Sequence, residues 1–248
     1  MYRKMFRSIS LTLTSILSLM VFQQAALAGP PLICHPFDIG NARSLPWSGS
    51  EWRAVDKNYD INRLVDDTIE LLTPETPVLV RMETLRRATV YGLWSMIDRK
   101  VGYEVKDAAV ANELLSRLKA RVPEPGEKSI KKETALALFD YGYLVESYKQ
   151  AGEGSEGAKL ASGTDGHELI NKAIALRGGD PQMELAAALA SADLPRGSRA
   201  ELRKAHFAHL QKAAASAKEG SLLARNLLTH FSNMGKTIAE FRANVAKN

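Results

Sequence analysis

Apolar residues recur at three- and four-residue steps along most of the chain, and prolines separate the stretches in which they do so. This spacing places apolar side chains on one face of an α-helix, and a helix tolerates proline only near its start. None of the ten prolines interrupts a periodic stretch. Alternating runs with Asn-Gly or Asp-Gly turns, which indicate β-hairpins, are missing apart from Asp165-Gly166, which resembles a helix start. The pattern therefore predicts an all-α fold.

Nine helices are predicted, preceded by a segment that has no helical period. This segment, residues 29–58, is expected to be an extended arm, and the glycine-rich stretch 152–163 is expected to be a flexible loop. The helices are expected at residues 60–72, 77–97, 105–121, 131–151, 165–176, 181–192, 199–217, 221–231 and 236–246.

Two of the predicted helices share a sequence frame at a distance of fifty residues. METLRRATVYG ends at Gly92 and KETALALFDYG ends at Gly142, and each glycine follows a tyrosine, Tyr91 or Tyr141. Glycine costs about 1 kcal/mol of helix propensity relative to alanine, so we expect a partner helix to approach closely over the bare backbone. These four residues and Tyr148 are predicted to be packing positions or the wall of a groove.

The helices that follow this pair are also similar to each other. NELLSRLKA at 112–120 parallels HELINKAIA at 167–175, and MELAAALAS at 183–191 repeats the first-helix pattern more faintly. Such repetition is typical of helical hairpins that bury their apolar faces against one another. We therefore expect antiparallel hairpins stacked as a short irregular α-solenoid in a domain of residues 59–248. The hairpins are expected near residues 77–121, 131–177 and 181–217, with capping helices within 221–246.

The first helix of each pair resembles that of the tetratricopeptide repeat, in which a large residue, Leu-Gly and a tyrosine recur at fixed spacing. Leu138, Tyr141-Gly142 and Val145 take those places, although tyrosine replaces the leucine and the final tyrosine is absent. The period is about fifty residues instead of 34. The resemblance covers roughly residues 77–192 and implies a scaffold that holds a peptide or protein in its groove. A generic α-solenoid or an irregular helical bundle is the alternative.

The first 28 residues have the features of a secretory signal peptide. Three basic residues within 1–7 precede an apolar run at 8–22, and Ala26-Leu27-Ala28 supplies small residues at the cleavage positions. The apolar run is shorter than the ~20 residues that a membrane-spanning helix needs. We expect cleavage after Ala28, export to the periplasm or the medium, and no transmembrane segment in the mature chain.

Removal of this segment changes the charge balance. The whole chain has 33 Lys and Arg against 28 Asp and Glu, and loss of three basic residues leaves 30 against 28. The high pI belongs largely to the discarded segment, so we do not expect nucleic-acid binding. Residues 191–248 keep ten basic and four acidic residues. A solvated helix surface explains this excess, and an acidic partner or membrane head groups are the alternative.

Motifs for catalysis or metal binding are scarce. The sequence has no phosphate-binding glycine loop, no Gly-x-Ser-x-Gly and no Cys-x-x-Cys. His206 and His209 are one helical turn apart, and His230 is a third candidate ligand. The His-Glu-x-x-His spacing of zinc helices is missing, so we favour ordinary surface histidines and expect no metal and no cofactor.

The arm contains the candidate anchor residues Cys34, Trp47 and Trp52. The tryptophans are expected to pin the arm onto the helices, and a sugar-stacking platform is the alternative. Cys34 is the only cysteine and is followed by His35, which Pro36 holds in an extended conformation. Adjacent extended residues point to opposite sides, so we expect an inert, docked Cys34 rather than a reactive thiol.

These features together predict an exported helical-repeat protein, a non-catalytic scaffold of the cell envelope that binds a protein or peptide. The alternative is a metal-binding protein or an enzyme whose site is assembled from scattered residues. His206, His209 and Cys34 are the residues that would build such a site.

Overall fold

The all-α fold predicted from the sequence is confirmed in the part of the chain that the structure describes. The computed structural model describes residues 29–94, 108–124, 130–151, 155–191 and 199–248. These residues form ten α-helices and no β-strand, and one antiparallel bridge links Trp47 to Val55 within the arm. Within the same residues, no helix combines the length and the apolar content that crossing a membrane requires.

The described residues contain three helical elements besides the α-helices. η2 and η5 are short 3-10 helices, and η3 is a π-helical continuation of α3. The elements are η2 (Ile61–Arg63), α2 (Leu64–Leu71), α3 (Val78–Thr89), η3 (Val90–Trp94), α4 (Ala109–Ala120), α5 (Lys131–Gln150), α6 (Glu156–Leu160), α7 (Gly166–Arg177), α8 (Pro181–Ser191), α9 (Arg199–Ser216), α10 (Leu222–His230), η5 (Ser232–Met234) and α11 (Ile238–Val245).

Local sequence accounts for where several helices begin and end. The Asp165 side chain accepts a hydrogen bond from Glu168 N at 2.8 Å and so caps the first turn of α7. Gly178 ends that helix with a φ of 72°, a left-handed conformation that glycine adopts without steric cost. Ser221 and Thr237 cap α10 and α11 in the same way as Asp165. The predicted bounds of these three helices therefore agree closely with the structure.

The stretch 152–163 departs from the prediction. It was expected to be a flexible loop, but residues 156–160 form the short helix α6, whose first turn is capped by Ser155. The Ser155 hydroxyl accepts a hydrogen bond from Ala158 N at 3.1 Å. Glycine content alone predicts a loop and takes no account of this cap. The predicted helix segments 95–97 and 105–107 lie outside the described residues.

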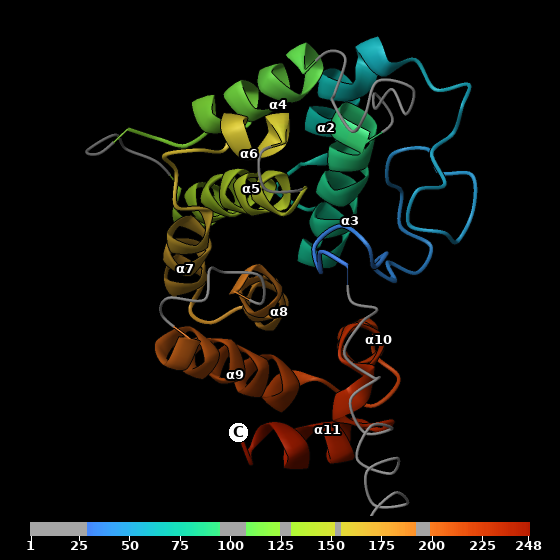
Figure 1. Ribbon diagram of the computed structural model, residues 1–248. Coiled ribbons are helices and arrows are strands. Elements are labelled where there is room, and N and C mark those ends of the chain that lie inside the picture. The colour runs from blue at the N-terminus through green and yellow to red at the C-terminus, as the bar shows by residue number, and fades with distance from the viewer. Residues whose placement is uncertain (1–28, 95–107, 125–129, 152–154, 192–198) are drawn as a thin grey trace, which may run out of the picture.

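Helix α5 is the central element of the fold. Every residue from Ala135 to Tyr148 is buried, and a helix that is covered on all sides needs neighbours on all sides. Helices α3, α4, α6, α7 and α8 all pack against it. In Figure 1, α5 lies between α4 and α6 on one side and α7 and α8 on the other.

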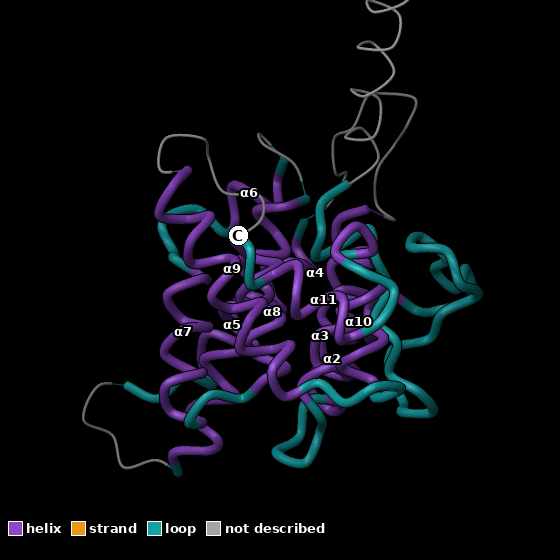
Figure 2. Tube along the Cα trace, turned by 90° about the horizontal axis from the view of Figure 1, so that it is seen from below, coloured by secondary structure: helices purple, strands orange, loops and turns teal. Residues whose placement is uncertain are grey.

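The remaining packing follows chain order only in part. The pairs α5–α7 and α8–α9 are the most extensive, and α11 packs against α9. Helix α4 packs mainly against α2 and α5 rather than α3. Figure 1 shows α2 and α4 at one end of the molecule and α11 at the other, and Figure 2 shows the loops around the edge of the helices. The solenoid arrangement and its likeness to tetratricopeptide repeats stay predictions.

Candidate functional site

Helix α3 buries charged side chains on two opposite faces. Arg81, Glu83 and Arg86 are each at most 1 % exposed. Two residues along a helix correspond to a rotation of about 200°, so Arg81 and Glu83 point in opposite directions. Arg81 pairs with α5 and Glu83 with the arm. A buried charge is costly unless it is paired and hydrogen-bonded, so each of these side chains needs partners inside the protein.

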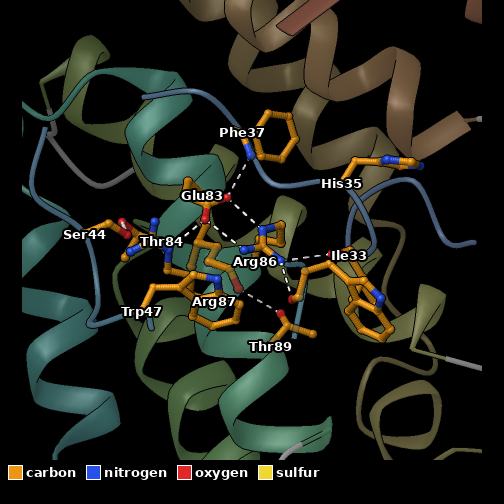
Figure 3. Close-up of polar contacts among 12 residues, drawn as sticks. Ile33, His35, Phe37, Ser44, Trp47, Glu83, Thr84, Arg86, Arg87 and Thr89 are labelled. Carbon is orange, nitrogen blue, oxygen red and sulfur yellow. Dashed lines mark hydrogen bonds and ion pairs between the residues drawn. The ribbon is translucent and has the colours of Figure 1, made fainter. Parts of the chain in front are cut away.

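On the arm side, the Glu83 carboxylate has a partner for both oxygens (Figure 3). Oε2 accepts hydrogen bonds from Phe37 N at 3.0 Å and from Arg86 Nε at 2.7 Å. Oε1 accepts from Arg86 Nη2 at 2.8 Å and from Arg87 Nε at 2.7 Å. We call these four residues the arm cluster. Its charges are paired and hydrogen-bonded, which is the condition for stable burial.

The two arginines of the arm cluster extend the network to the arm backbone. Arg86 Nη1 donates to Ile33 O at 3.1 Å and to Trp52 O at 3.0 Å. Arg87 Nη1 donates to Leu45 O at 2.5 Å. Buried carbonyl groups need hydrogen-bond donors, and an arm without regular structure obtains them here from α3.

Trp47 and Tyr91 hold the next part of the arm. The Trp47 ring lies 4.9 Å from the Arg86 guanidinium carbon and meets the Tyr91 ring edge-on at 5.8 Å. The Tyr91 hydroxyl donates to Pro46 O at 2.7 Å and accepts from Asp56 N at 2.9 Å. Trp47 and Tyr91 are therefore placed to anchor the arm, whereas Trp52 contributes its backbone carbonyl to Arg86.

The arm also contacts α10, far along the chain, through Asp38. Asp38 N donates to Asn226 Oδ1 at 2.9 Å, and Asn226 Nδ2 donates back to Asp38 O at 2.8 Å. The Asp38 carboxylate accepts a hydrogen bond from Arg225 Nε at 2.6 Å, which lowers the pKa of Asp38. Leu32 N donates to Gln150 Oε1 of α5 at 2.9 Å. The arm thus contacts α3, α5 and α10.

Cys34 and His35 lie in this docked part of the arm and are half-buried. Burial raises the pKa of the Cys34 thiol, which reduces the fraction of nucleophilic thiolate. The His230 ring lies 5.7 Å from the His35 ring and stacks on Phe37 at 4.5 Å. Burial lowers the pKa of His230 to about 4, so this imidazole is neutral near pH 7.

The two repeated glycines lie at helix contacts. A methyl group on Gly142 would lie 2.7 Å from Gly166 O and 2.8 Å from Leu169 Cβ, so α7 approaches α5 over the bare backbone. A methyl group on Gly92 would lie 3.4 Å from Ala111 Cβ of α4. The close approach expected from the sequence is present at Gly142, whereas the contact at Gly92 would have an ordinary van der Waals length.

The tyrosines of α5 are packing residues. Tyr148 is fully buried, and its hydroxyl donates to Ala111 O at 2.9 Å. Tyr141 is 7 % exposed and its hydroxyl lies 3.3 Å from Thr164 Oγ1. Neither side chain is among the residues that line the two cavities described below.

The histidines of α9 are not surface residues, contrary to the prediction. His209 is 9 % exposed, and its Nδ1 lies 2.5 Å from Glu184 Oε2 of α8. His206 is half-buried with Nδ1 2.8 Å from Ala188 O, and burial lowers its pKa. The sequence showed the helical position of each residue but not that α8 covers this part of α9.

These histidines do not assemble the alternative site. In the described part of the chain, no group of three or more His, Cys, Asp or Glu side chains has the geometry to hold a metal ion. Cys34 lies in the arm beside α3, whereas His206 and His209 contact α8.

On the face of α3 opposite the arm cluster, Arg81 forms a buried ion pair with Asp140 of α5. Arg81 Nη1 is 2.5 Å from Asp140 Oδ2 of α5, and each residue is 1 % exposed. Arg81 also donates to Thr76 O at 3.1 Å and to Thr73 O. Asp140 Oδ1, however, is buried without a hydrogen-bond partner. Burial raises the pKa of Asp140 to about 6, outweighing the attraction of Arg81 and Arg121.

Arg81 also lines a cavity that opens to solvent. This first cavity has a volume of about 410 Å³, and a second one of about 210 Å³ shares Pro74 and Leu136 with it. We call the two together the α3–α5 cleft. The other residues of the first cavity are Arg121, Pro123, Ile130, Glu133, Thr134 and Ala137. Those of the second are Glu75, Thr76, Pro77, Val78, Lys132, Arg177, Asp180 and Gln182.

Helices α3 and α5 both begin at this cleft. Neither of their N-cap residues, Pro77 and Ile130, supplies a capping side chain. The Ile130 side chain is 63 % exposed, the one large hydrophobic residue so exposed in the described chain. In the sequence, the prolines at this cleft indicate only helix joints. A charged residue on each apolar helix face, Arg81 and Asp140, was the signal that sequence reasoning missed.

The chain matches no protein-family model, and comparison with curated proteins and with solved structures gives no match. Its function is therefore inferred from its own geometry.

Proposed function

We propose that this protein is an exported, non-catalytic binding protein and that the α3–α5 cleft holds an extended segment of a partner protein. The observation that carries the proposal is the adjacency of two cavities that share Pro74 and Leu136, the first of them lined by the exposed Ile130. The first cavity alone is within the range of about 300–1,000 Å³ that ligand pockets occupy. The exposed Ile130 side chain is part of the wall of this cavity and adds apolar surface to it.

The shape of the cleft favours a chain segment over a small molecule. The shared residues Pro74 and Leu136 place the second cavity directly beside the first. An extended peptide advances about 3.3 Å per residue and points alternate side chains to opposite sides, so one segment reaches both cavities. The apolar wall of the first cavity, which includes Ile130 and Ala137, buries an aliphatic side chain of that segment. Such burial is worth about 25 cal/mol per Å² of apolar surface.

The groups that meet at the cleft are suited to holding a ligand. Arg81 is fixed by three hydrogen bonds, and its neighbours in the first cavity are mostly prolines and aliphatic side chains. Fixed donors and apolar walls reduce the entropy cost of association. We assign the protein no reaction.

Export is part of the same proposal and rests on residues 1–28, which lie outside the described residues. The basic start, apolar run and small residues at 26 and 28 support it. The expected mature chain begins at Gly29, and intact-mass measurement of the protein recovered from the periplasm or medium tests this. A protein found there with residues 1–28 attached would contradict cleavage.

Site-specific crosslinking in cells tests the cleft. A photoreactive p-benzoylphenylalanine replaces Ile130 in one variant and Lys119, an exposed α4 residue outside the cleft, in the control. We expect a discrete crosslinked product from position 130 only, lost when Leu136→Arg fills the cleft. Equal crosslinking at both positions, or none at 130, would contradict the proposal.

A further inference from the structure

The ligand chemistry of the α3–α5 cleft follows from its cations. Arg121 forms no ion pair among the described residues, and its Nη2 donates to Leu72 O at 2.8 Å. Arginine has five N–H donors in a fixed plane that matches a carboxylate with two parallel hydrogen bonds. Arg121 therefore retains donors for a ligand at the wall of the first cavity.

Arg81 is the second cation of this cavity. Its bonds to Thr73 O, Thr76 O and Asp140 use Nε and one N–H on each terminal nitrogen, so one N–H on each terminal nitrogen remains. The bonds also fix the guanidinium in place, which lowers the entropy cost of binding a further acceptor.

The start of two helices at the cleft adds to this preference. The first-turn N–H groups of a helix have no acceptor within the helix, and they give its N-terminus a partial positive charge. Leu79 N of α3 is already satisfied by Gln182 Oε1 at 3.0 Å. The first turn of α5 receives no side-chain cap from Ile130. The start of α5 therefore favours a negatively charged group in the cleft.

The formal charges of the exposed wall residues cancel. Arg121 and Lys132 are opposed by Glu75 and Glu133, and Arg177 pairs with Asp180 at 2.9 Å at the joint of α7 and α8. These four wall residues are all exposed, so water screens them. Arg121 can still hydrogen-bond a ligand directly. The buried pair of Arg81 and Asp140 is screened much less, so its protonation state has the larger effect on the electrostatic field in the cleft.

We propose that the partner segment carries an acidic side chain next to an aliphatic one, and that Arg121 and Arg81 bind its carboxylate more tightly when Asp140 takes up a proton. This inference rests on the proposed function, because it concerns the ligand of the same cleft. With Asp140 ionised, the charge of Arg81 is compensated. With Asp140 protonated, the cleft gains one positive charge, so binding of the carboxylate and uptake of the proton favour each other.

The pH range follows from the residues around Asp140. The charges that act on it are Arg81 of α3 and Arg121 after α4, and the pKa of Asp140 is about 6. A peptide glutamate has a pKa of about 4.3, so it stays ionised at pH 5.5 while much of Asp140 is protonated. Affinity for an acidic segment should therefore increase between pH 7.5 and pH 5.5.

The test uses the mature chain and an array of acetylated, amidated octapeptides. Each pairs one aliphatic or aromatic residue with Glu, Gln or Lys at a neighbouring position, and affinities are measured by fluorescence polarisation at pH 7.5 and 5.5. We expect the best Glu peptide to bind about tenfold tighter than its Gln counterpart, as for one added charge-assisted contact. We expect it to bind a further ~3- to 10-fold tighter at pH 5.5, with little change for the Gln peptide.

Two variants and a matched control assign the effect to residues. Arg121→Gln should abolish the preference for Glu, and Lys119→Gln, the removal of an exposed cation outside the cleft, should keep it. Asp140→Asn should bind the Glu peptide at pH 7.5 as the wild type does at pH 5.5, without further pH dependence. If this variant does not fold, the wild-type pH series with the Glu and Gln peptides decides alone.

The outcomes separate this inference from the proposed function. Equal binding of the Glu and Gln peptides at both pH values overturns the carboxylate and leaves the cleft as a peptide site. Tighter binding of the Lys peptide would also overturn the proposal that the cleft binds a carboxylate. If no peptide in the array binds, both the inference and the proposed function are overturned.

Discussion

Helix α3 contributes to two buried charged groups, the arm cluster and the pair of Arg81 and Asp140. They differ in whether every oxygen of the buried carboxylate has a hydrogen-bond partner. In the arm cluster both Glu83 oxygens accept two hydrogen bonds each. In the pair of Arg81 and Asp140 beside the cleft, Asp140 Oδ1 accepts no hydrogen bond. Both occur in one helix of twelve residues, so the difference does not come from the local backbone.

This difference distinguishes a structural network, which holds the arm in place, from a pair that lies at the proposed binding site. A complete buried network holds two segments in one geometry, and the arm cluster does this for an arm that lacks regular structure. An incomplete network costs stability, since an unsatisfied buried polar group is penalised by about 1–3 kcal/mol. The incomplete pair is also the one beside an open cavity. Perturbed titratable groups of this kind are concentrated at functional sites.

The largest expected effect is loss of the arm cluster. Glu83→Gln leaves the Arg86 and Arg87 charges without a counter-charge inside the protein, which typically destabilises by about 3–5 kcal/mol. Urea unfolding monitored by circular dichroism measures the change. Glu113→Gln, on the exposed face of α4, is the control and should stay within about 0.5 kcal/mol of wild type. A loss below ~1 kcal/mol for Glu83→Gln would show that the network does not fasten the arm.

A second test is the pH dependence of stability, for which the two regions should have opposite signs. Asp140 has a pKa of about 6 in the folded protein, above its unfolded value of about 3.9. Its contribution to stability is fully present below pH 3.9 and is lost as the pH rises through 6. His230, beside the arm cluster, has a pKa of about 4, below its unfolded value of about 6.5. Its contribution is present above pH 6.5 and is lost as the pH falls through 4.

Each contribution amounts to up to about 3 kcal/mol. Compared with wild type, Asp140→Asn should therefore lose stability between pH 7 and 4, and His230→Gln should gain it. Urea midpoints at pH 7, 6, 5 and 4 measure both, and comparison with wild type removes the effect of other titrating groups. Variants whose pH profiles run parallel to that of the wild type would remove the distinction between the two regions.

A smaller effect is expected for the aromatic cover of the arm cluster. Trp47→Leu removes the ring near Arg86 and Tyr91 but leaves the hydrogen bonds of Glu83 in place. Loss of a cation–π contact and of some buried area should cost about 1–2 kcal/mol, measured by the same unfolding experiment. A loss as large as that of Glu83→Gln would mean that the ring, rather than the charges, holds the arm.

The smallest effect on stability is expected when both members of the incomplete pair are replaced. Arg81→Met with Asp140→Leu removes a buried ion pair whose desolvation is not fully compensated, and such replacements are often neutral or stabilising. We expect a change within about 1 kcal/mol and, at the same time, loss of binding of the acidic peptides. Destabilisation beyond ~3 kcal/mol would indicate that this pair is structural, like the arm cluster.

The parts of the fold that depend on residues close together in the sequence were predictable. The apolar period gave the helices, Asp165 and Gly178 gave the ends of α7, and the pattern around Gly142 indicated a close helix approach. The burial of His209 was not predictable, because it depends on Glu184 of another helix. The pair of Arg81 and Asp140 is separated by 59 residues, so its existence depends on how α3 and α5 pack.

The candidate site was less accessible to sequence reasoning than the fold. The sequence analysis looked for residue types used in catalysis, whereas the cleft is built from prolines, aliphatic side chains and arginines at three helix joints. None of these residue types is unusual by itself. The informative feature was a carboxylate, Asp140, among Leu136, Phe139 and Tyr143 on a helix that is buried on all sides.

The contact of Asp38 with Asn226 joins residues 188 positions apart, and this determines when the arm folds. During synthesis the arm emerges long before its partner in α10, because the two are 188 residues apart. Contacts of such high sequence separation form late, because the chain between them must be ordered first. Docking of residues 32–39 is therefore a closing step of folding. Until then the apolar side chains of this segment need protection from aggregation.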